Sequence, residues 1–81
     1  MRSECIEELI RGRREIEFAY QNKMYSITYY NDNREKYISF CEYYKKPIDV
    51  KNATELLEIR INGKSLKAIF SRLSDSEVSI F

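Results

Sequence analysis

Between Arg14 and Tyr30, apolar and polar side chains alternate, and this alternation constrains the fold more than any other feature of the sequence. A period of two places successive side chains on opposite faces of a strand, whereas a helix would repeat every three or four residues. The alternation is interrupted at Gln21-Asn22-Lys23, where asparagine tolerates the positive φ of a tight turn. The segment therefore predicts a hairpin of two strands, near 14–20 and 24–30, with one buried face.

The apolar residues also predict how the strands pair. A two-residue loop at Asn22-Lys23 would set Ile16 opposite Tyr29, and every inward pair would then join apolar side chains. A loop centred on Asp32-Asn33 would lead into a third strand near 36–43 by the same rule. The result is a three-stranded antiparallel meander. Its predicted inward pairs are Tyr20 with Tyr25, Phe18 with Ile27, Ile16 with Tyr29, Ile27 with Ile38 and Tyr25 with Phe40.

The meander divides the tyrosines between two faces. Of the seven tyrosines in the chain, Tyr20, Tyr25 and Tyr29 share the inner parity, and their hydroxyls are expected to reach water or a backbone partner at the rim of the core. Tyr44 falls on the same parity, at the end of the third strand. The inner face is expected to hold Ile16, Phe18, Tyr20, Tyr25, Ile27, Tyr29, Ile38 and Phe40.

A helical period precedes the strands. From about Ser3, apolar residues recur at the spacing of one helix face, and glutamates in the first turn suit the positive end of the helix dipole. Gly12 fits the left-handed position that commonly ends a helix. These signals predict a first helix whose apolar face comprises Cys5, Ile6, Leu9 and Ile10.

Two further helices are expected after the third strand. Lys45-Lys46-Pro47 breaks the extended run, because proline cannot donate to a strand ladder. Asn52, followed three residues later by Glu55, resembles a capping box at a helix start, and Asn62-Gly63 interrupts the helix that follows. The expected core positions are Leu56, Leu57 and Ile59 in the second helix and Leu66, Ile69, Phe70 and Leu73 in the third.

The element order defines the fold class. A chain of 81 residues supports one small core, so we expect a single domain over residues 1–81. Its order, α-β-β-β-α-α, predicts an α+β fold in which the helices cover one face of the meander. The tail 77–81 alternates as well, which is compatible with a short fourth strand at a sheet edge.

Composition narrows the class of protein. Fourteen basic and thirteen acidic residues give a net charge of +1, without the basic excess typical of nucleic-acid binders. Histidine is absent, and Cys5 and Cys41 form no CxxC pair, so we expect no metal and no cofactor. Neither a membrane-spanning run nor a signal peptide is recognisable. We expect a reduced, soluble, cytoplasmic protein without a membrane partner.

No motif predicts catalysis. Gly63-Lys64-Ser65 matches the end of a phosphate-binding loop, but Glu58 stands where that motif requires glycine. Without histidine, an enzyme would need a glutamate or lysine base, or Cys41 as nucleophile. Glu15 and Glu17 share a face but are more typical of a solvated row. We therefore expect no enzyme.

The outer face of the meander is the candidate functional surface. Tyr30, Tyr37 and Tyr43 have outward parity, beside Met24 and Cys41. Tyrosine is enriched at interfaces because it contributes a large contact area at low conformational cost. This face predicts protein binding or a homodimer. Two alternatives remain open: the rings are ordinary sheet residues, or another segment of the chain covers them.

Nucleic-acid binding is the competing hypothesis. Aromatic rings on an open sheet can stack single-stranded bases, and a basic groove then follows the phosphates. The outward carboxylates Glu15 and Glu17 oppose this hypothesis, as does the absence of an RNP-like motif. The basic residues near the candidate face are Arg34, Lys36, Lys45 and Lys46.

Two segments carry a family resemblance. GRREIEFAYQNKMYSITYY (12–30), followed by LLEIRINGKSLKAIF (56–70), resembles small uncharacterised proteins of Gram-positive bacteria and their phages. Such sequences often have Asn-Gly or Asp-Gly-Lys at the first hairpin, where this chain has Gln21-Asn22-Lys23. The resemblance brings no known activity. It implies an accessory protein of a phage or mobile element, a class that commonly binds a host protein or a rival nuclease.

Overall fold

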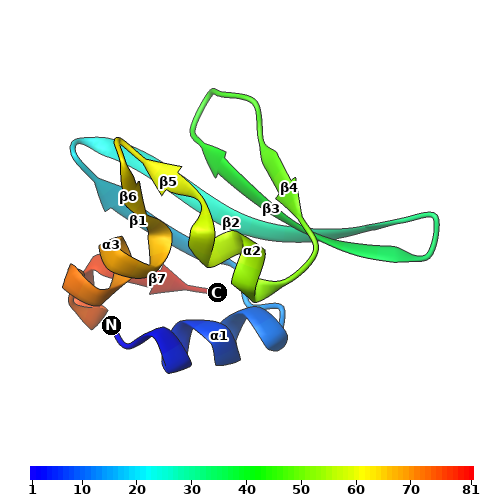
Figure 1. Ribbon diagram of the computed structural model, residues 1–81, viewed down its shortest axis with the longest axis horizontal. Coiled ribbons are helices and arrows are strands. Elements are labelled where there is room, and N and C mark those ends of the chain that lie inside the picture. Colours follow the sequence, from blue (N-terminus) through cyan, green and yellow to red (C-terminus); the bar gives the residue numbers. More distant parts are fainter.

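The computed structural model describes residues 1–81, apart from the side chain of Ser3, and consists of an antiparallel sheet with helices on one side (Figure 1). Five strands follow one another across the main sheet in the order β4-β3-β2-β1-β7, and β5 pairs with β6 in a separate hairpin. The elements are α1 (Ser3–Arg11), β1 (Ile16–Tyr20), β2 (Lys23–Asp32), β3 (Glu35–Glu42), β4 (Ile48–Val50), α2 (Ala53–Glu58), β5 (Arg60–Ile61), β6 (Lys64–Ser65), α3 (Leu66–Arg72), the 3-10 helix η1 (Asp75–Glu77) and β7 (Val78–Ile80).

The α+β class and the meander are confirmed, but both predicted registers are wrong by two residues. Ile16 pairs with Ile27, where the sequence predicted Tyr29, and Ile27 in turn pairs with Phe40, where it predicted Ile38. The loops are centred one residue away from their predicted places, at Gln21-Asn22 and Asn33-Arg34. All four loop residues have positive φ, which is the conformation of a type I′ turn: Gln21 50°, Asn22 63°, Asn33 50° and Arg34 68°.

The predicted inner face is nevertheless correct, because a shift of two residues does not change which face a side chain occupies. Its aliphatic and phenylalanine side chains are buried, as is Tyr25, while Tyr20 and Tyr29 are partly buried against the core. Tyr44 is the exception. It lies beyond β3 with φ 68° and is fully exposed, so its predicted inward place is wrong. The loop after β3 has already left the extended conformation at this residue.

The strands outside the meander complete the sheet. The predicted C-terminal strand is present as β7, which pairs with β1 at one edge. The opposite edge is β4, a strand that the sequence did not predict, and Asn62-Gly63 forms the turn between β5 and β6. β4, β5 and β6 are two or three residues long, too short to show a period.

The helix boundaries follow their capping groups. The side chain of Asn52 accepts from the backbone N–H of Glu55 at 2.9 Å, as predicted. The Glu55 carboxylate accepts from the backbone N–H of Lys51 at 3.0 Å. The second hydrogen bond of the predicted capping box is therefore made with the residue before the N-cap, and not with Asn52 itself. Gly12 has φ −77°, and Arg13 adopts φ 54°, so the predicted left-handed conformation falls one residue later.

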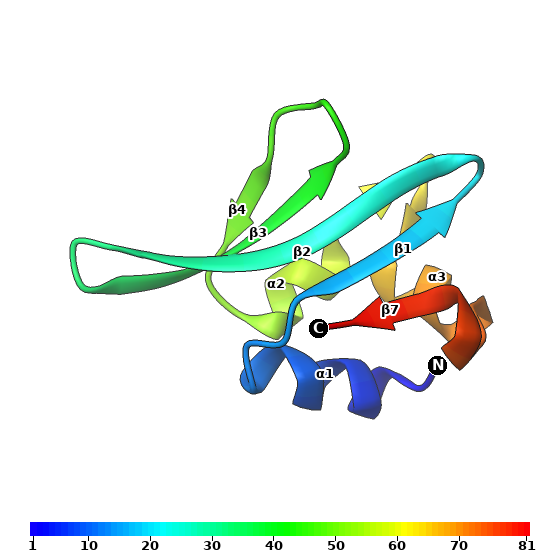
Figure 2. The ribbon, with the colours of Figure 1, turned by 180° about the vertical axis from the view of Figure 1, so that it is seen from behind.

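The two faces of the sheet differ. The apolar sides of α1, α2 and α3 pack on the inner face and form one core with it. From behind, no helix lies in front of the strands (Figure 2). Because β1 pairs with β2 only as far as Ile27, and β4 pairs with β3 only from Ile38, residues 28–37 project as a two-stranded arm (Figures 1 and 2). Among the described residues, no helix is both long enough and apolar enough to cross a membrane.

Candidate functional site

The outer sheet face is open to solvent. Met24, Tyr30 and Tyr43 keep 41%, 39% and 37% of their surface exposed, while Tyr37 and Cys41 are partly buried. None of these side chains belongs to the core on the other side. No segment of the described chain covers this face (Figure 2). This excludes one of the two alternatives left open by the sequence.

The five predicted residues lie at two ends of this face. Tyr30 and Tyr37 are register partners on the arm, whereas Tyr43 lies beside Met24, whose carbonyl accepts from the Tyr43 N–H at 2.9 Å. Tyr30 lies six positions beyond Met24 along β2, which corresponds to roughly 20 Å. Between the ends lie Ser26, Thr28, Ser39 and Cys41, which face one another across β2 and β3.

Tyr30 and Tyr37 form a stacked pair, called here the tyrosine pair. Their ring centroids are 5.2 Å apart and the ring planes differ by 18°. The Tyr30 hydroxyl donates to Asp49 Oδ2 at 2.7 Å, and the Tyr37 hydroxyl donates to Glu35 Oε2 at 2.7 Å. Asp32 is the register partner of Glu35 at the end of the arm, so the pair has an acidic border.

A lysine of the same chain already contacts the tyrosine pair. Lys51 Nζ is 3.2 Å from Glu35 Oε2 and 5.8 Å from the centroid of the Tyr37 ring. The hydrogen bond from Tyr37 and the charge of Lys51 lower the pKa of Glu35. A cation over an aromatic face, held by a carboxylate, is the geometry in which lysine and arginine side chains are recognised.

The other end of the face repeats the combination of tyrosine and carboxylate. Tyr43 reaches across β2 and donates to Glu17 Oε2 on β1 at 2.6 Å. The Tyr44 ring stands edge-on to the Tyr43 ring, with centroids 6.3 Å apart. All three predicted tyrosines thus donate their hydroxyls to carboxylates, and the carboxylates raise the pKa of each phenol.

The Tyr30 hydrogen bond predicts a pH dependence. The pKa of Tyr30 is raised from 10.0 to about 12, chiefly because its hydroxyl donates to Asp49 and secondarily because of burial. Since the folded-state pKa lies above the unfolded value, this hydrogen bond stabilises the fold below pH 10, and the contribution is lost between pH 10 and about 12. In Asp49→Asn, we expect Tyr30 to titrate closer to pH 10. NMR of tyrosine labelled at the ring carbon that bears the hydroxyl would follow it.

Assignment of that resonance requires a reference spectrum. The resonance that vanishes in Tyr30→Phe identifies Tyr30, and Tyr29, whose pKa is also raised to about 12 chiefly by burial, serves as the control. Tyr29 should titrate equally in wild type and Asp49→Asn. Titration of Tyr30 near pH 10 in the wild-type protein would contradict the Asp49 contact.

The basic residues of the nucleic-acid hypothesis do not form one set. Arg34 lies in the turn of the arm, and Lys36 has the inner parity of β3. Lys45 and Lys46 lie in the connection between β3 and β4, beyond the opposite end of β3. Strand residues on the outer face itself contribute the acidic side chains Glu17, Asp32, Glu35 and Asp49.

The residues considered for catalysis form no recognisable active site. Cys41 Sγ lies 3.1 Å from both the Glu42 and the Lys45 carbonyl oxygens, so the thiol contacts acceptors and no base. The Glu17 carboxylate accepts from Tyr43. Within the described part of the chain, no group of three or more potential ligands among Cys, Asp and Glu is placed to hold a metal ion.

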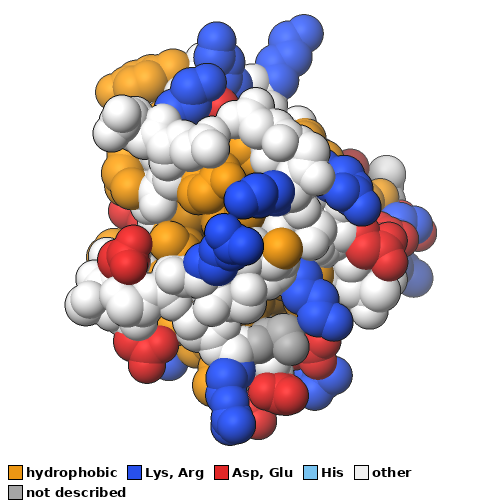
Figure 3. Space-filling model, turned by 60° about the vertical axis from the view of Figure 1, so that its left-hand side comes forward, with side chains coloured by type: hydrophobic (Ala, Val, Ile, Leu, Met, Phe, Trp, Pro, Cys, Tyr) orange, Lys and Arg blue, Asp and Glu red, His pale blue; other side chains and the backbone are white. Residues whose placement is uncertain are grey.

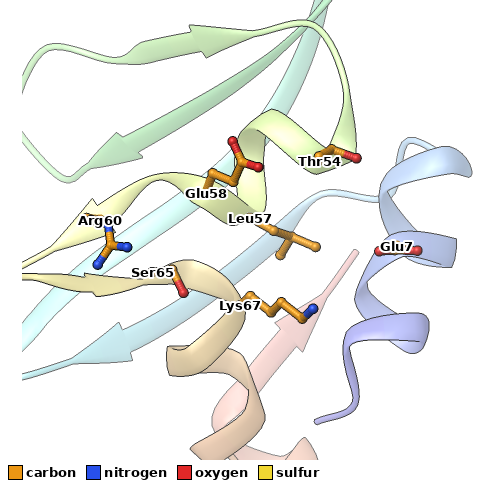
Figure 4. A pocket seen from close by; sticks show the side chains of 7 residues that line it. All are labelled: Glu7, Thr54, Leu57, Glu58, Arg60, Ser65 and Lys67. Carbon is orange, nitrogen blue, oxygen red and sulfur yellow. The ribbon is translucent and has the colours of Figure 1, made fainter.

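A mixed-charge hollow of about 540 Å³ lies on the helical side, between α1, α2, the β5–β6 hairpin and α3. Lys67 extends from α3 toward Glu7 on α1, and Glu58 and Arg60 lie near the hairpin (Figure 4). The two acidic and two basic side chains balance, so this hollow favours neither anions nor cations. The surface near α3, β5 and β6 carries Lys and Arg side chains around apolar patches (Figure 3).

Asp32 and Glu35 fell outside the predicted strands; extending the alternation from Tyr30 and Tyr37 to the observed strand ends would have placed both on the outer face. The Asp49 and Lys51 contacts escaped prediction because they depend on β4, whose three residues give no periodic signal. No family model, curated protein or solved structure matches this chain.

Proposed function

We propose that this protein is a non-catalytic binding module, and that its outer sheet face recognises a basic surface of a protein partner. The observation that carries the proposal is the pairing of exposed tyrosines with carboxylates: Tyr30 with Asp49, Tyr37 with Glu35 and Tyr43 with Glu17. Tyrosine rings supply contact area, and the carboxylates supply complementarity to lysine or arginine.

The contact made by Lys51 supports this partner chemistry. Its ammonium group lies against Glu35 and over the Tyr37 ring, on the outer face. An incoming lysine or arginine would find the same combination of ring and carboxylate at Tyr30 and Asp49, and an arginine could contact the carboxylate with two hydrogen bonds.

A partner protein explains this face better than nucleic acid does. Phosphates would approach four strand carboxylates, which repel them, while the lysines of the β3–β4 connection lie beyond the end of the face. A homodimer through two copies of the acidic face would bring like charges together. A phage or mobile-element accessory role, which the sequence resemblance implies, is compatible with a protein partner.

The first test replaces the three tyrosines together. We expect Tyr30→Ser/Tyr37→Ser/Tyr43→Ser to remain folded, because these side chains lie outside the core. Binding to a partner should weaken by at least tenfold, since buried tyrosines at interfaces are frequent hot spots. The tagged protein and the variant would be compared for proteins retained from a nuclease-treated bacterial lysate, and the retained protein would then be titrated against both.

The control is Tyr44→Ser, which removes an exposed ring that makes no carboxylate contact. This variant should bind like wild type. Equal retention by the triple variant would exclude the outer face as the binding surface. Retention of nucleic acid when nuclease is omitted, with a steep loss at higher salt, would favour the nucleic-acid hypothesis instead.

A further inference from the structure

A second hollow, of about 360 Å³, lies on the helical side at the base of the arm. It is bounded by the end of α1, by Lys36 and Ile38 of β3 and by the segment between β4 and α2. The end of α1 and the β4–α2 segment lie close together in both ribbon views (Figures 1 and 2). Its lining includes the basic residues Arg11, Arg13, Lys36 and Lys51 and no acidic residue. Ile10 and Ile38, both buried, supply its apolar part.

These four basic side chains are not equally free to bind a ligand. Arg11 is 3.6 Å from Glu7 in a largely exposed pair, so solvent screens that contact. The Lys51 ammonium is directed to Glu35 on the outer face. Among the described residues, neither Arg13 nor Lys36 takes part in an ion pair. The uncompensated charge of the hollow therefore rests mainly on Arg13 and Lys36.

Arg13 is held in place without a carboxylate. Its backbone adopts φ 54° two residues after the end of α1. Its guanidinium carbon lies 5.1 Å from the centroid of the Tyr29 ring, and Nη2 donates to Asn31 Oδ1 at 3.3 Å. A guanidinium oriented by a ring and an amide keeps further N–H groups for an anion, and it loses little side-chain freedom on binding.

We propose that this hollow binds a compact ligand that carries several phosphate charges, such as a nucleotide or a short polyphosphate. Lysine and arginine without a carboxylate partner select anions, and the volume lies in the range of small-molecule sites. A polymer would need basic residues that continue along a track, whereas Lys45 and Lys46 lie beyond the other end of β3. The site lies on the opposite side of the sheet from the proposed protein interface and does not depend on it.

The test is a calorimetric titration of the protein with sodium tripolyphosphate at low salt. We expect binding by the wild-type protein and a loss of at least tenfold in affinity in Arg13→Gln/Lys36→Gln, because each lost charged hydrogen bond costs about tenfold or more. Lys45→Gln/Lys46→Gln is the matched control, since it removes the same charge away from the hollow. The control should bind within about twofold of wild type. Added salt should weaken tripolyphosphate binding by the wild-type protein and by the control.

Further probes separate the possible ligands. Tighter binding of ATP than of tripolyphosphate, lost in Arg13→Gln/Lys36→Gln, supports a nucleotide whose base contacts the apolar part of the hollow; equal binding supports recognition of the phosphate chain alone. The proposal is overturned if millimolar tripolyphosphate and ATP both fail to bind, or if the two double variants lose affinity equally. Tighter binding of a single-stranded oligonucleotide, weakened as much by the Lys45/Lys46 variant, overturns it in favour of a nucleic-acid surface. Circular dichroism establishes that both variants are folded before titration.

Discussion

Phe18→Ala should unfold most of this protein at room temperature or leave it barely stable. Phe18 is 1% exposed, and its ring lies between the sheet and α3. Its centroid is 5.3 Å from that of Tyr25, 6.4 Å from that of Phe40 and 4.8 Å from that of Phe70. Truncating a buried phenylalanine costs about 3–5 kcal/mol, because burial is lost and a cavity remains. Domains of this size have roughly 5 kcal/mol or little more in total.

Urea unfolding followed by circular dichroism measures this loss. The matched control is Tyr44→Ala, which removes another aromatic ring from a fully exposed position. The control should change the free energy of unfolding by no more than about 0.5 kcal/mol. A loss below about 1 kcal/mol in Phe18→Ala would mean that the four rings do not share one core, and the packing of α3 on the sheet would have to be wrong.

The sequence determined the faces of the sheet because the hydrophobic effect acts on every second residue of a strand. Ile16, Phe18, Ile27, Ile38 and Phe40 could all be assigned inward without any knowledge of the turns. The outward places of Tyr30, Tyr37 and Tyr43 follow from the same alternation, although their partners do not. A pattern of period two therefore predicts which face of the sheet a side chain occupies, but not which residue of the neighbouring strand it contacts.

The strand register could not be predicted because two registers satisfy the same pattern. The predicted pair of Ile16 with Tyr29 and the observed pair with Ile27 are both apolar. The turn residues did not identify the observed register. Each observed loop has one asparagine beside a residue without special preference for positive φ, and the predicted Asp32-Asn33 loop suits positive φ at least as well. Gln21 and Arg34 adopt positive φ in the observed turns, at a cost of roughly 1–2 kcal/mol per residue that the ladders must offset.

The candidate site was predictable only in part for a related reason. Its tyrosines lie on long strands with a clear period, whereas Asp49 and Lys51 lie on or next to a strand of three residues after Pro47. Their contacts with Tyr30 and Tyr37 join segments that are far apart in the chain, and no local signal specifies such pairs. The carboxylate partner of Tyr30 and the cation beside Tyr37 therefore became evident only from the strand pairing.

A cross-strand disulfide would test the observed register directly, and it should strongly stabilise the fold. Ser26 and Cys41 are register partners on the outer face, whereas the predicted register would set Met24 opposite Cys41. In a Cys5→Ser background, Ser26→Cys should oxidise to an intramolecular disulfide, because opposed Cβ atoms in an antiparallel pair lie within bonding range. Closing a loop of about 15 residues stabilises by about 3 kcal/mol in the chain-entropy model.

Urea unfolding with and without reductant gives this stabilisation, and mass spectrometry of peptides identifies the bond. Met24→Cys in the same background is the control, and it should stay reduced or form intermolecular dimers, because Cys41 then lies diagonally across β2 and β3. Rapid intramolecular oxidation of Met24→Cys, but not of Ser26→Cys, would restore the register predicted from the sequence. In that register Tyr30 and Tyr37 would no longer stack, since they are opposite each other only in the observed register. The proposed binding surface therefore depends on the observed register of β2 and β3.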